Sequence, residues 1–162
     1  MKTIYLAGGC FWGTQKFFDQ FEGVKKTTVG YANGEKADPT YEEVCNNSGH
    51  AETVKIEYDE AQIPTSKILE YYFMTIDPTS LNRQGVDTGI QYRTGIYYED
   101  DILLSDIESA MEQEQKKYDV PLVVEVMPLQ SFYTAEEYHQ KYLDKNPGGY
   151  CHINPSLIKL GS

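Results

Sequence analysis

The sequence has few basic residues and no long apolar run. Its 162 residues include 14 Lys and Arg against 25 Asp and Glu, which gives a formal net charge of −11. A surface this acidic repels nucleic-acid backbones and anionic lipids, so neither is an expected partner. No stretch of about 18 apolar residues is available to span a bilayer. The opening segment, MKTIYLAGG, also lacks the apolar length of a signal peptide, so we expect a soluble, cytoplasmic protein.

Cysteine is scarce as well. Cys10, Cys45 and Cys151 form an odd set at wide and unequal spacings, unlike the even framework of a small secreted domain. The three histidines share no zinc-like spacing with these cysteines, so we expect no metal. The interpretation that remains is a catalytic or redox-active thiol.

The apolar pattern alternates between strand-like and helix-like segments, without an internal repeat or a linker. It predicts strands at 3–9, 24–34, 53–59, 94–98 and 122–130. It predicts helices from Cys10 to a cap at Gly23, from about Thr65, and between the last two strands. Residues 37–52 and 77–93 are predicted to be loops.

This order of elements, with an antiparallel pairing of the second and third strands, favours an α+β fold. The specific prediction is a two-layer sandwich with a ferredoxin-like βαββαβ core. We expect one catalytic domain over residues 1–162, with an irregular C-terminal tail from about residue 144.

The segment LAGGCFWGTQKFF places Cys10 between the first strand and the first helix. The unpaired N–H groups and the positive dipole end of a helix N-terminus favour a thiolate. Such a position is expected to lower the pKa of the thiol, which makes Cys10 the best nucleophile in the chain. The alternative is a buried, inert cysteine.

The motif GGCFWG resembles the signature of the A-type peptide methionine sulfoxide reductases, which reduce the S-epimer of methionine sulfoxide. TVGYANG, PTYEEVC, GHAETVKIEYD, RQG with QYR, YHQKYL and NPGGYC match the family in the same order, up to Cys151. The resemblance implies thiol-dependent reduction of methionine sulfoxide, free or in proteins, to methionine. It implies no cofactor.

The resemblance also implies roles for the residues around Cys10. The Cys10 thiolate attacks the sulfoxide sulfur, and Phe11 and Trp12 bracket its methyl group. This step leaves Cys10 as a sulfenic acid. Cys151, in GGYC, matches the resolving cysteine, which forms a Cys10–Cys151 disulfide that thioredoxin then reduces.

Four further residues match the family's polar site. Glu52 matches the catalytic acid, because a carboxyl group in an aromatic pocket keeps its proton near neutral pH. Tyr41 and Tyr92 match the tyrosines whose hydroxyls bind the sulfoxide oxygen. Asp87 matches a loop carboxylate that orders water or the substrate backbone.

The sequence departs from the family pattern in two places. Many relatives carry a further cysteine beyond the one matched by Cys151, so we expect direct recycling here. Val86 and Ile90 stand where Asn and Thr or Ser are common in the substrate loop. We interpret Cys45 as non-catalytic, and we expect a monomer.

Three other functions stay open at this point. A cysteine hydrolase or acyltransferase would use His50 or His139 to activate Cys10, but no such signature is legible. A thiol peroxidase would share the sulfenic acid and the resolving cysteine, yet it needs no aromatic slot for a methyl group. A pure binding module would leave the reactive cysteine unexplained.

Overall fold

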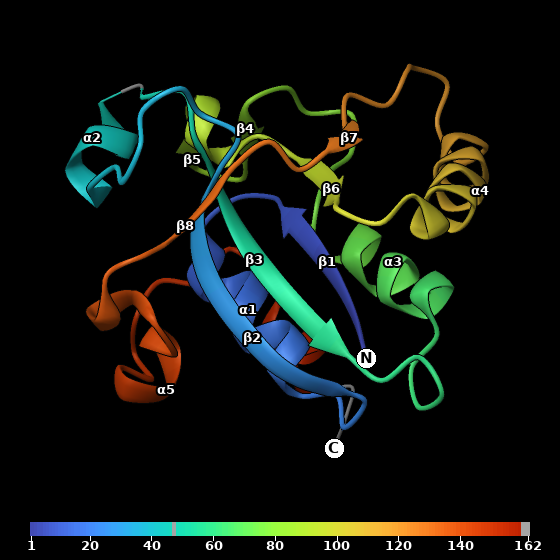
Figure 1. The fold of residues 1–162 in the computed structure, drawn as a ribbon, viewed down its shortest axis with the longest axis horizontal. Helices are drawn as coiled ribbons and strands as arrows, with labels where there is room; N and C mark the ends of the chain where they lie inside the picture. Colours follow the sequence, from blue (N-terminus) through green and yellow to red (C-terminus); the bar gives the residue numbers. More distant parts are fainter. Residues whose placement is uncertain (47, 160–162) are drawn as a thin grey trace.

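The computed structural model describes residues 1–46 and 48–159. A six-stranded sheet forms its centre (Figure 1). Its strands are β1 (Lys2–Ala7), β2 (Val24–Ala32), β3 (Ala51–Tyr58), β6 (Gly95–Tyr98), β7 (Glu125–Pro128) and β8 (Phe132–Thr134). Across the sheet they stand in the order β7-β6-β1-β3-β2-β8.

The inner four strands confirm the ferredoxin-like core. Strand β1 pairs antiparallel with both β3 and β6, and β2 pairs antiparallel with β3. This is the order 4-1-3-2 when the strands of a βαββαβ unit are counted along the chain. At one edge β7 runs parallel to β6, and at the other β8 runs antiparallel to β2, so the complete sheet is mixed.

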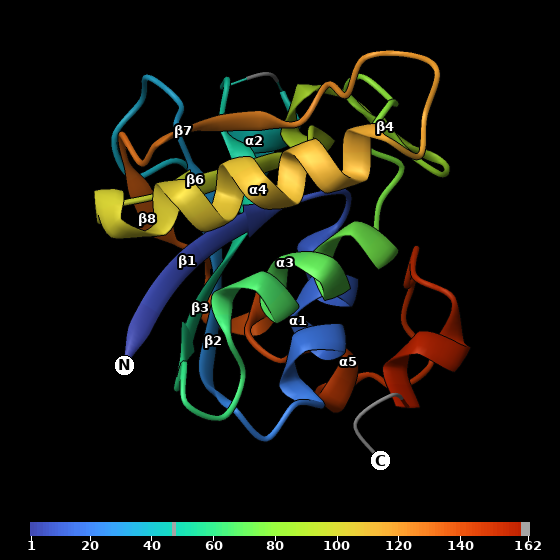
Figure 2. The same cartoon turned by 90° about the vertical axis from the view of Figure 1, so that its right-hand side faces the viewer.

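Helices cover one face of this sheet. The α-helices are α1 (Phe11–Asp19), α2 (Tyr41–Cys45), α3 (Thr65–Met74), α4 (Leu104–Gln115) and α5 (Tyr142–Lys145). Figure 2 shows α1 and α3 on the same side of β1, β2 and β3, with α4 beside α3. Short elements complete the chain: β4 (Arg83–Gln84), β5 (Asp87–Thr88), and the 3-10 turns η1 (Ile90–Tyr92), η2 (Asp101–Leu103), η3 (Glu137–His139) and η4 (Pro155–Lys159).

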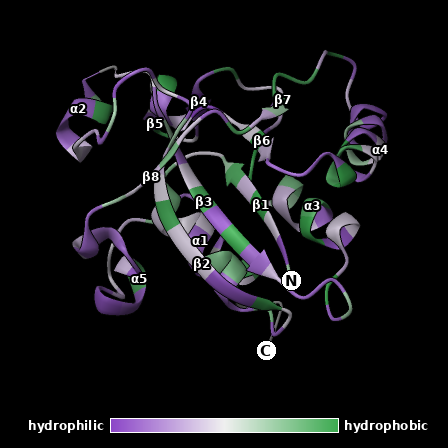
Figure 3. Cartoon of the chain, in the orientation of Figure 1, coloured by the Kyte–Doolittle hydropathy of each residue, from purple (hydrophilic) through white to green (hydrophobic). Residues whose placement is uncertain are grey.

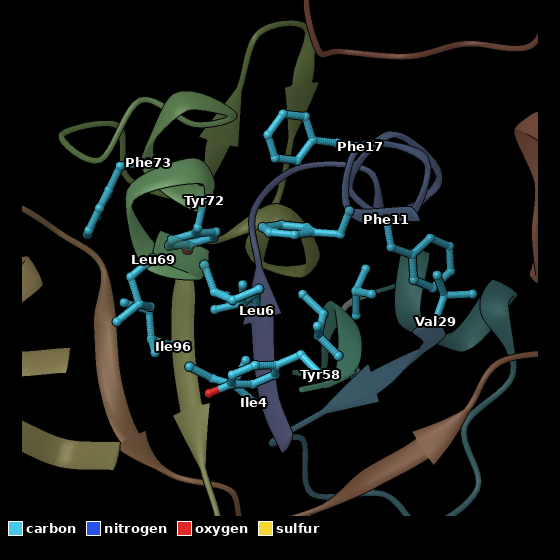
Figure 4. Packing of buried hydrophobic residues seen from close by; sticks show 14 of the residues in the cluster. Ile4, Leu6, Phe11, Phe17, Val29, Tyr58, Leu69, Tyr72, Phe73 and Ile96 are labelled. Carbon is cyan, nitrogen blue, oxygen red and sulfur yellow. The ribbon is translucent and has the colours of Figure 1, made fainter. Parts of the chain in front are cut away.

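The core lies between the sheet and helices α1 and α3. Successive side chains of a strand point to opposite faces, and Figure 3 shows green and purple bands following one another along β3. On β1, Ile4 and Leu6 are fully buried on the helix side, where Figure 4 shows Leu6 near Tyr72 and Ile4 near Tyr58. Tyr5 and Ala7 pack on the opposite face in a second, smaller cluster.

Two local expectations are wrong. The first helix ends at Asp19 with Gln20 as its cap, not at Gly23. Gly23 lies instead in the turn before β2, where a side chain would collide with Ile63. The predicted loop 37–52 contains helix α2, which begins with a capping box formed by Thr40 and Glu43.

The strand register gathers several chain ends at one edge of the sheet. Ala7, at the end of β1, lies opposite Thr53 near the start of β3 and opposite Gly95 at the start of β6. The residues just beyond these pairs therefore come together. No helix in the described part of the chain has the length and apolar character needed to cross a bilayer.

Candidate active site

Cys10 lies where β1 turns into α1. Gly8 and Gly9 make this turn: Gly9 has a φ of +75°, and a side chain on Gly8 would meet Ile76 at 2.5 Å. The N–H of Gly9 donates to the carbonyl of Tyr92 at 3.1 Å, which ties the turn to η1. Cys10 is the N-cap residue of α1 and is only 6% exposed. The predicted strand-to-helix position is confirmed.

The predicted lowering of the Cys10 pKa is wrong for this site. Burial raises the pKa of the Cys10 thiol, and the neighbouring Glu52 raises it further. The backbone N–H of Trp12 opposes this shift, but more weakly. The helix N-terminus therefore does lower the pKa of Cys10, but the loss of hydration on burial raises it by more.

Glu52 lies at the start of β3, opposite Tyr31 of β2, and is 1% exposed. Its Oε1 accepts a hydrogen bond from the N–H of Phe11 at 3.2 Å, at the first turn of α1. Its Oε2 is buried and has no hydrogen-bond partner among the described residues. Burial raises the pKa of Glu52 to about 8, so the carboxyl group is mostly protonated at pH 7.

Two phenols share this environment. Tyr41 begins α2, and Tyr92 ends η1. Burial raises the pKa of both phenols, and the charge of Glu52 raises both pKa values further. Both tyrosines therefore lie near the Glu52 carboxyl group and keep their protons, so each can donate a hydrogen bond.

Phe11 and Trp12 occupy different surroundings. Phe11 is fully buried, with its ring 5.8 Å from that of Tyr31. Trp12 is partly exposed, and its indole stacks on Tyr142 at 3.8 Å with 12° between the planes. The indole Nε1 also donates to Nδ1 of His139 at 2.9 Å. Two contacts therefore fix the plane of the Trp12 indole.

Asp87 joins the substrate loop to the C-terminal segment. It lies in the two-residue strand β5, and its Oδ2 accepts a hydrogen bond from the hydroxyl of Tyr150 at 2.9 Å. Its charge also raises the pKa values of Cys10 and Glu52, so it lies close to both. The C-terminal segment is therefore joined to the loop that carries Asp87, next to Cys10 and Glu52.

Cys151 lies above the first turn of α1. A Cβ atom built on Gly13 would be 3.0 Å from the Sγ of Cys151, so the missing side chain of Gly13 makes room for this sulfur. The charge of Cys151 also raises the pKa of the Cys10 thiol, so the two cysteines lie close together. All three cysteines of the chain are free thiols. On its outer side Cys151 borders a cavity of about 500 Å³ together with Lys16, Leu143 and Ile158.

The eight predicted site residues thus come together, from the N-cap and first turn of α1, from α2, β3, the loop after α3 and the C-terminal segment. The two histidines that a cysteine hydrolase would need to activate Cys10 hydrogen-bond to other side chains instead. His139 accepts from Trp12, and Nδ1 of His50 pairs with the hydroxyl of Ser48 at 2.8 Å. Among the described residues, no three His, Cys, Asp or Glu side chains converge as a metal site requires.

Sequence reasoning missed Glu136, which supports Tyr41. Its Oε1 accepts from the hydroxyl of Tyr31 at 2.7 Å, and its Oε2 accepts from the N–H of Tyr41 at 3.0 Å. One carboxylate therefore ties the first residue of α2 to the sheet. No local pattern marks this residue, because its partners lie 95 and 105 positions away.

Comparisons with known proteins agree with this geometry. A family model described as peptide methionine sulfoxide reductase matches residues 2–160. The chain is 61% identical over 153 residues to a protein from Lachnoclostridium phytofermentans named peptide methionine sulfoxide reductase MsrA, covering 94% of this chain and 92% of the relative. It is 57% identical over 160 residues to the Clostridium acetobutylicum protein of the same name, covering 98% and 99% of the two chains.

Solved structures give the same result. Mxr1 from Saccharomyces cerevisiae in its reduced form matches with a TM-score of 0.89 and 37% identity, over 94% of this chain and 91% of that one. Methionine sulfoxide reductase A of Corynebacterium diphtheriae matches with a TM-score of 0.83 and 36% identity, over 93% and 77%. The fold, the gathered side chains and these similarities lead to one conclusion: the chain belongs to the A-type peptide methionine sulfoxide reductases.

Proposed function

We propose that this enzyme reduces the S-epimer of methionine sulfoxide, free or in proteins, and that Cys10 is the nucleophile. The observation that carries the proposal is the pairing of a buried thiol with a buried, protonated carboxyl group. Glu52 has one oxygen held by the Phe11 N–H and the other without a partner among the described residues. A carboxyl group in this state is ready to donate a proton to an incoming oxygen.

The proposed first step moves one oxygen atom and two electrons. Glu52 protonates the sulfoxide oxygen, and Tyr41 and Tyr92 donate hydrogen bonds to the same atom. This makes the substrate sulfur electrophilic, and the Cys10 sulfur attacks it as the thiol proton passes to the Glu52 carboxylate. The hydroxyl group then moves from the substrate sulfur to the Cys10 sulfur as the bond between the two sulfur atoms breaks. The substrate leaves as methionine and Cys10 becomes a sulfenic acid, so the substrate is reduced and the thiol is oxidised.

Stereochemistry follows from three fixed positions around the sulfur. The oxygen faces Glu52 and the two tyrosines, the methyl group contacts the aromatic side chains of Phe11 and Trp12, and Cys10 attacks along a third direction. Asp87 binds the substrate backbone or an ordered water molecule. The opposite epimer cannot fill the oxygen and methyl positions and also leave the direction of attack by Cys10 open, because inversion at sulfur exchanges two substituents.

The proposed second step regenerates the thiol. Cys151 attacks the sulfenic acid of Cys10, which forms a disulfide and releases water, and a dithiol protein then reduces this disulfide. Thioredoxin is the proposed reductant. A structure of the yeast relative Mxr1 in complex with Trx2 supports it, with a TM-score of 0.63 and 27% identity over 87% of this chain and 84% of that one. We propose that a monomer in the cytoplasm performs the cycle, since one catalytic domain supplies both cysteines.

A stereospecific turnover assay tests this proposal. The S- and R-epimers of a methionine sulfoxide peptide are offered separately, with dithiothreitol as reductant and the Cys10→Ser variant as control. We expect reduction of the S-epimer alone, and none by the variant. Reduction of neither epimer by folded protein would overturn the proposal and favour the cysteine hydrolase.

A further inference from the structure

His152 occupies a cradle formed by the two glycines that flank Cys10. A Cβ atom built on Gly9 would be 2.9 Å from Nε2 of His152, and one built on Gly13 would be 3.2 Å from its Nδ1. Neither position therefore tolerates a side chain without moving the ring. The imidazole lies against the backbone on both sides of Cys10, and it follows Cys151 directly in sequence.

The same cradle holds the sulfur of Cys151. The Cβ position of Gly13 is 3.0 Å from this sulfur and 3.2 Å from Nδ1 of His152, so both atoms converge on one point above α1. Cys10 begins this turn of the helix. A titratable ring is therefore placed beside the Cys151 sulfur and against the glycines on either side of Cys10.

Both ring nitrogens of His152 are buried, and neither has a hydrogen-bond partner among the described residues. The carbonyl of Gly8 approaches the ring without meeting hydrogen-bond geometry. Burial lowers the pKa of His152, which favours the neutral ring, while the charge of Asp87 acts in the opposite direction. Burying a neutral imidazole whose nitrogens have no hydrogen-bond partner costs more free energy than burying an apolar side chain of the same size. A functional role would explain why a histidine is present here.

We propose that His152 is the proton-transfer residue of the second step, moving the proton of Cys151 to the oxygen that leaves Cys10. This inference rests on the proposed function. An imidazole nitrogen accepts the proton of the Cys151 thiol, the Cys151 sulfur attacks the Cys10 sulfur, and the S–O bond breaks. The leaving hydroxide takes the proton from the imidazolium and departs as water. One thiol and one sulfenic acid become one disulfide and one water, with no further reactant.

The environment explains why such a group is required. Cys10 is buried, so hydroxide would have to leave into a poorly hydrated pocket that already contains Glu52 and Asp87. A second negative charge there is costly, and a proton supplied as the S–O bond breaks avoids it. Asp87 itself accepts from the hydroxyl of Tyr150, so it is already engaged. The titratable groups placed near His152 are Asp87, whose charge raises its pKa, and Cys151, whose sulfur shares the space above Gly13.

The test follows the two steps separately in a single turnover without reductant. The His152→Gln variant and the parent protein are mixed with one equivalent of an S-sulfoxide peptide, and methionine and the Cys10–Cys151 disulfide are quantified by mass spectrometry. In the variant we expect one methionine per protein, while disulfide formation slows by about 100-fold, the usual size of a proton-transfer contribution. The sulfenic acid of Cys10 accumulates and reacts with a dimedone probe.

Two further measurements separate proton transfer from a structural role. First, added imidazole should restore disulfide formation in the His152→Ala variant. Second, the rate of disulfide formation should fall at low pH in the parent protein, because the His152 ring becomes protonated, and this fall should be absent in the variant. Asn154→Ala, at an exposed position of the same segment, is the matched control and should form the disulfide at the parent rate.

Disulfide formation within threefold of the parent rate in His152→Gln would overturn the inference. So would a slow disulfide step that imidazole does not restore and whose pH dependence is unchanged. Absence of methionine from the parent protein would instead contradict the proposed function, so the two failures are distinguishable.

Discussion

The two sulfur atoms of the proposed cycle sit in contrasting parts of the molecule. Cys10 stands between a central strand and a nine-residue helix, and is 6% exposed. Cys151 lies in a segment without regular structure between α5 and η4, and it borders an open cavity. The first position is held by the sheet and its core, whereas the second is held by a few local contacts.

This difference matches what each step requires. Reduction of a sulfoxide needs a dry pocket in which the proton of Glu52 and the hydroxyls of the tyrosines already point to one place. Disulfide formation needs one sulfur to travel toward another and then to meet a partner protein. Gly13, which has no side chain, lets the segment that carries Cys151 approach α1.

The largest effect is expected from Glu52→Gln. The amide keeps the size of the carboxyl group but has no acidic proton, so methionine formation in a single turnover should slow by about 10²- to 10⁴-fold. Rapid-quench measurement of methionine checks this. Glu57→Gln, a change further along the same strand, is the matched control. A loss of less than threefold would show that Glu52 is not the acid.

The pH dependence of the parent enzyme sharpens the same point. Since burial raises the pKa of Glu52 to about 8, the protonated form that acts as the acid is present below this pH and is lost above it. The rate constant for methionine formation should therefore be level near pH 7 and fall as pH rises through about 8. The fall should be absent in Glu52→Gln. A rate that increases with pH through this range would contradict the assignment.

A smaller effect is expected from Glu136→Ala. The carboxylate accepts from the hydroxyl of Tyr31 and from the N–H of Tyr41, and its removal leaves the start of α2 without this anchor. Hydrogen bonds to a charged group contribute about 1.5–3 kcal/mol, so we expect a loss of methionine formation of about 10- to 150-fold.

The Tyr41→Phe background provides the control for Glu136. If Glu136 acts by placing the Tyr41 hydroxyl, the loss should largely vanish once that hydroxyl is absent. An equal loss in both backgrounds would show that Glu136 serves general stability instead.

Gly13→Ala should affect only the second step of the cycle, in which the disulfide forms. The new Cβ would stand 3.0 Å from the Cys151 sulfur, so the segment has to shift away from α1. We expect disulfide formation to slow by about tenfold, because small misplacements of reacting groups are costly, while methionine formation stays unchanged. Thermal unfolding should show no loss of stability, since Ala is the better helix former. An equal slowing of both steps would remove the distinction between the two regions.

The smallest effect is expected from Cys45→Ser. Cys45 is exposed and its side chain lies near that of Tyr41. A serine hydroxyl can replace that contact, so both steps should stay within about twofold of the parent rates. Loss of disulfide formation in this variant would show that Cys45 takes part in the thiol chemistry.

Local sequence patterns predicted the framework of the fold well. The alternation of Val54, Ile56 and Tyr58 identified β3, and the apolar stripe from Ile68 to Phe73 identified α3. The five-residue helix α2 was missed because it is too short to show a period, although Thr40 and Glu43 carry a capping signal. Strand β8, only three residues long, was missed for the same reason.

The sequence singled out residues that the structure brings together, but it did not predict their electrostatics. The pKa of Cys10 shifts opposite to the helix-terminus argument, because burial depends on tertiary packing and not on the local motif. His152 was noticed only as a histidine without a zinc-like spacing. Its place between Gly9 and Gly13 depends on how the C-terminal segment folds back on α1, which no local pattern reveals.

One measurement tests the central claim most directly: a single turnover in which methionine and the Cys10–Cys151 disulfide are quantified in the same quenched samples. The parent protein, without reductant, receives one equivalent of an S-sulfoxide peptide. Our account predicts one methionine per protein, followed by one disulfide between Cys10 and Cys151. It also predicts that Cys151→Ser still yields the methionine and stops at a sulfenic acid on Cys10. Methionine formed by Cys10→Ser, or a disulfide that does not include Cys10, would contradict it.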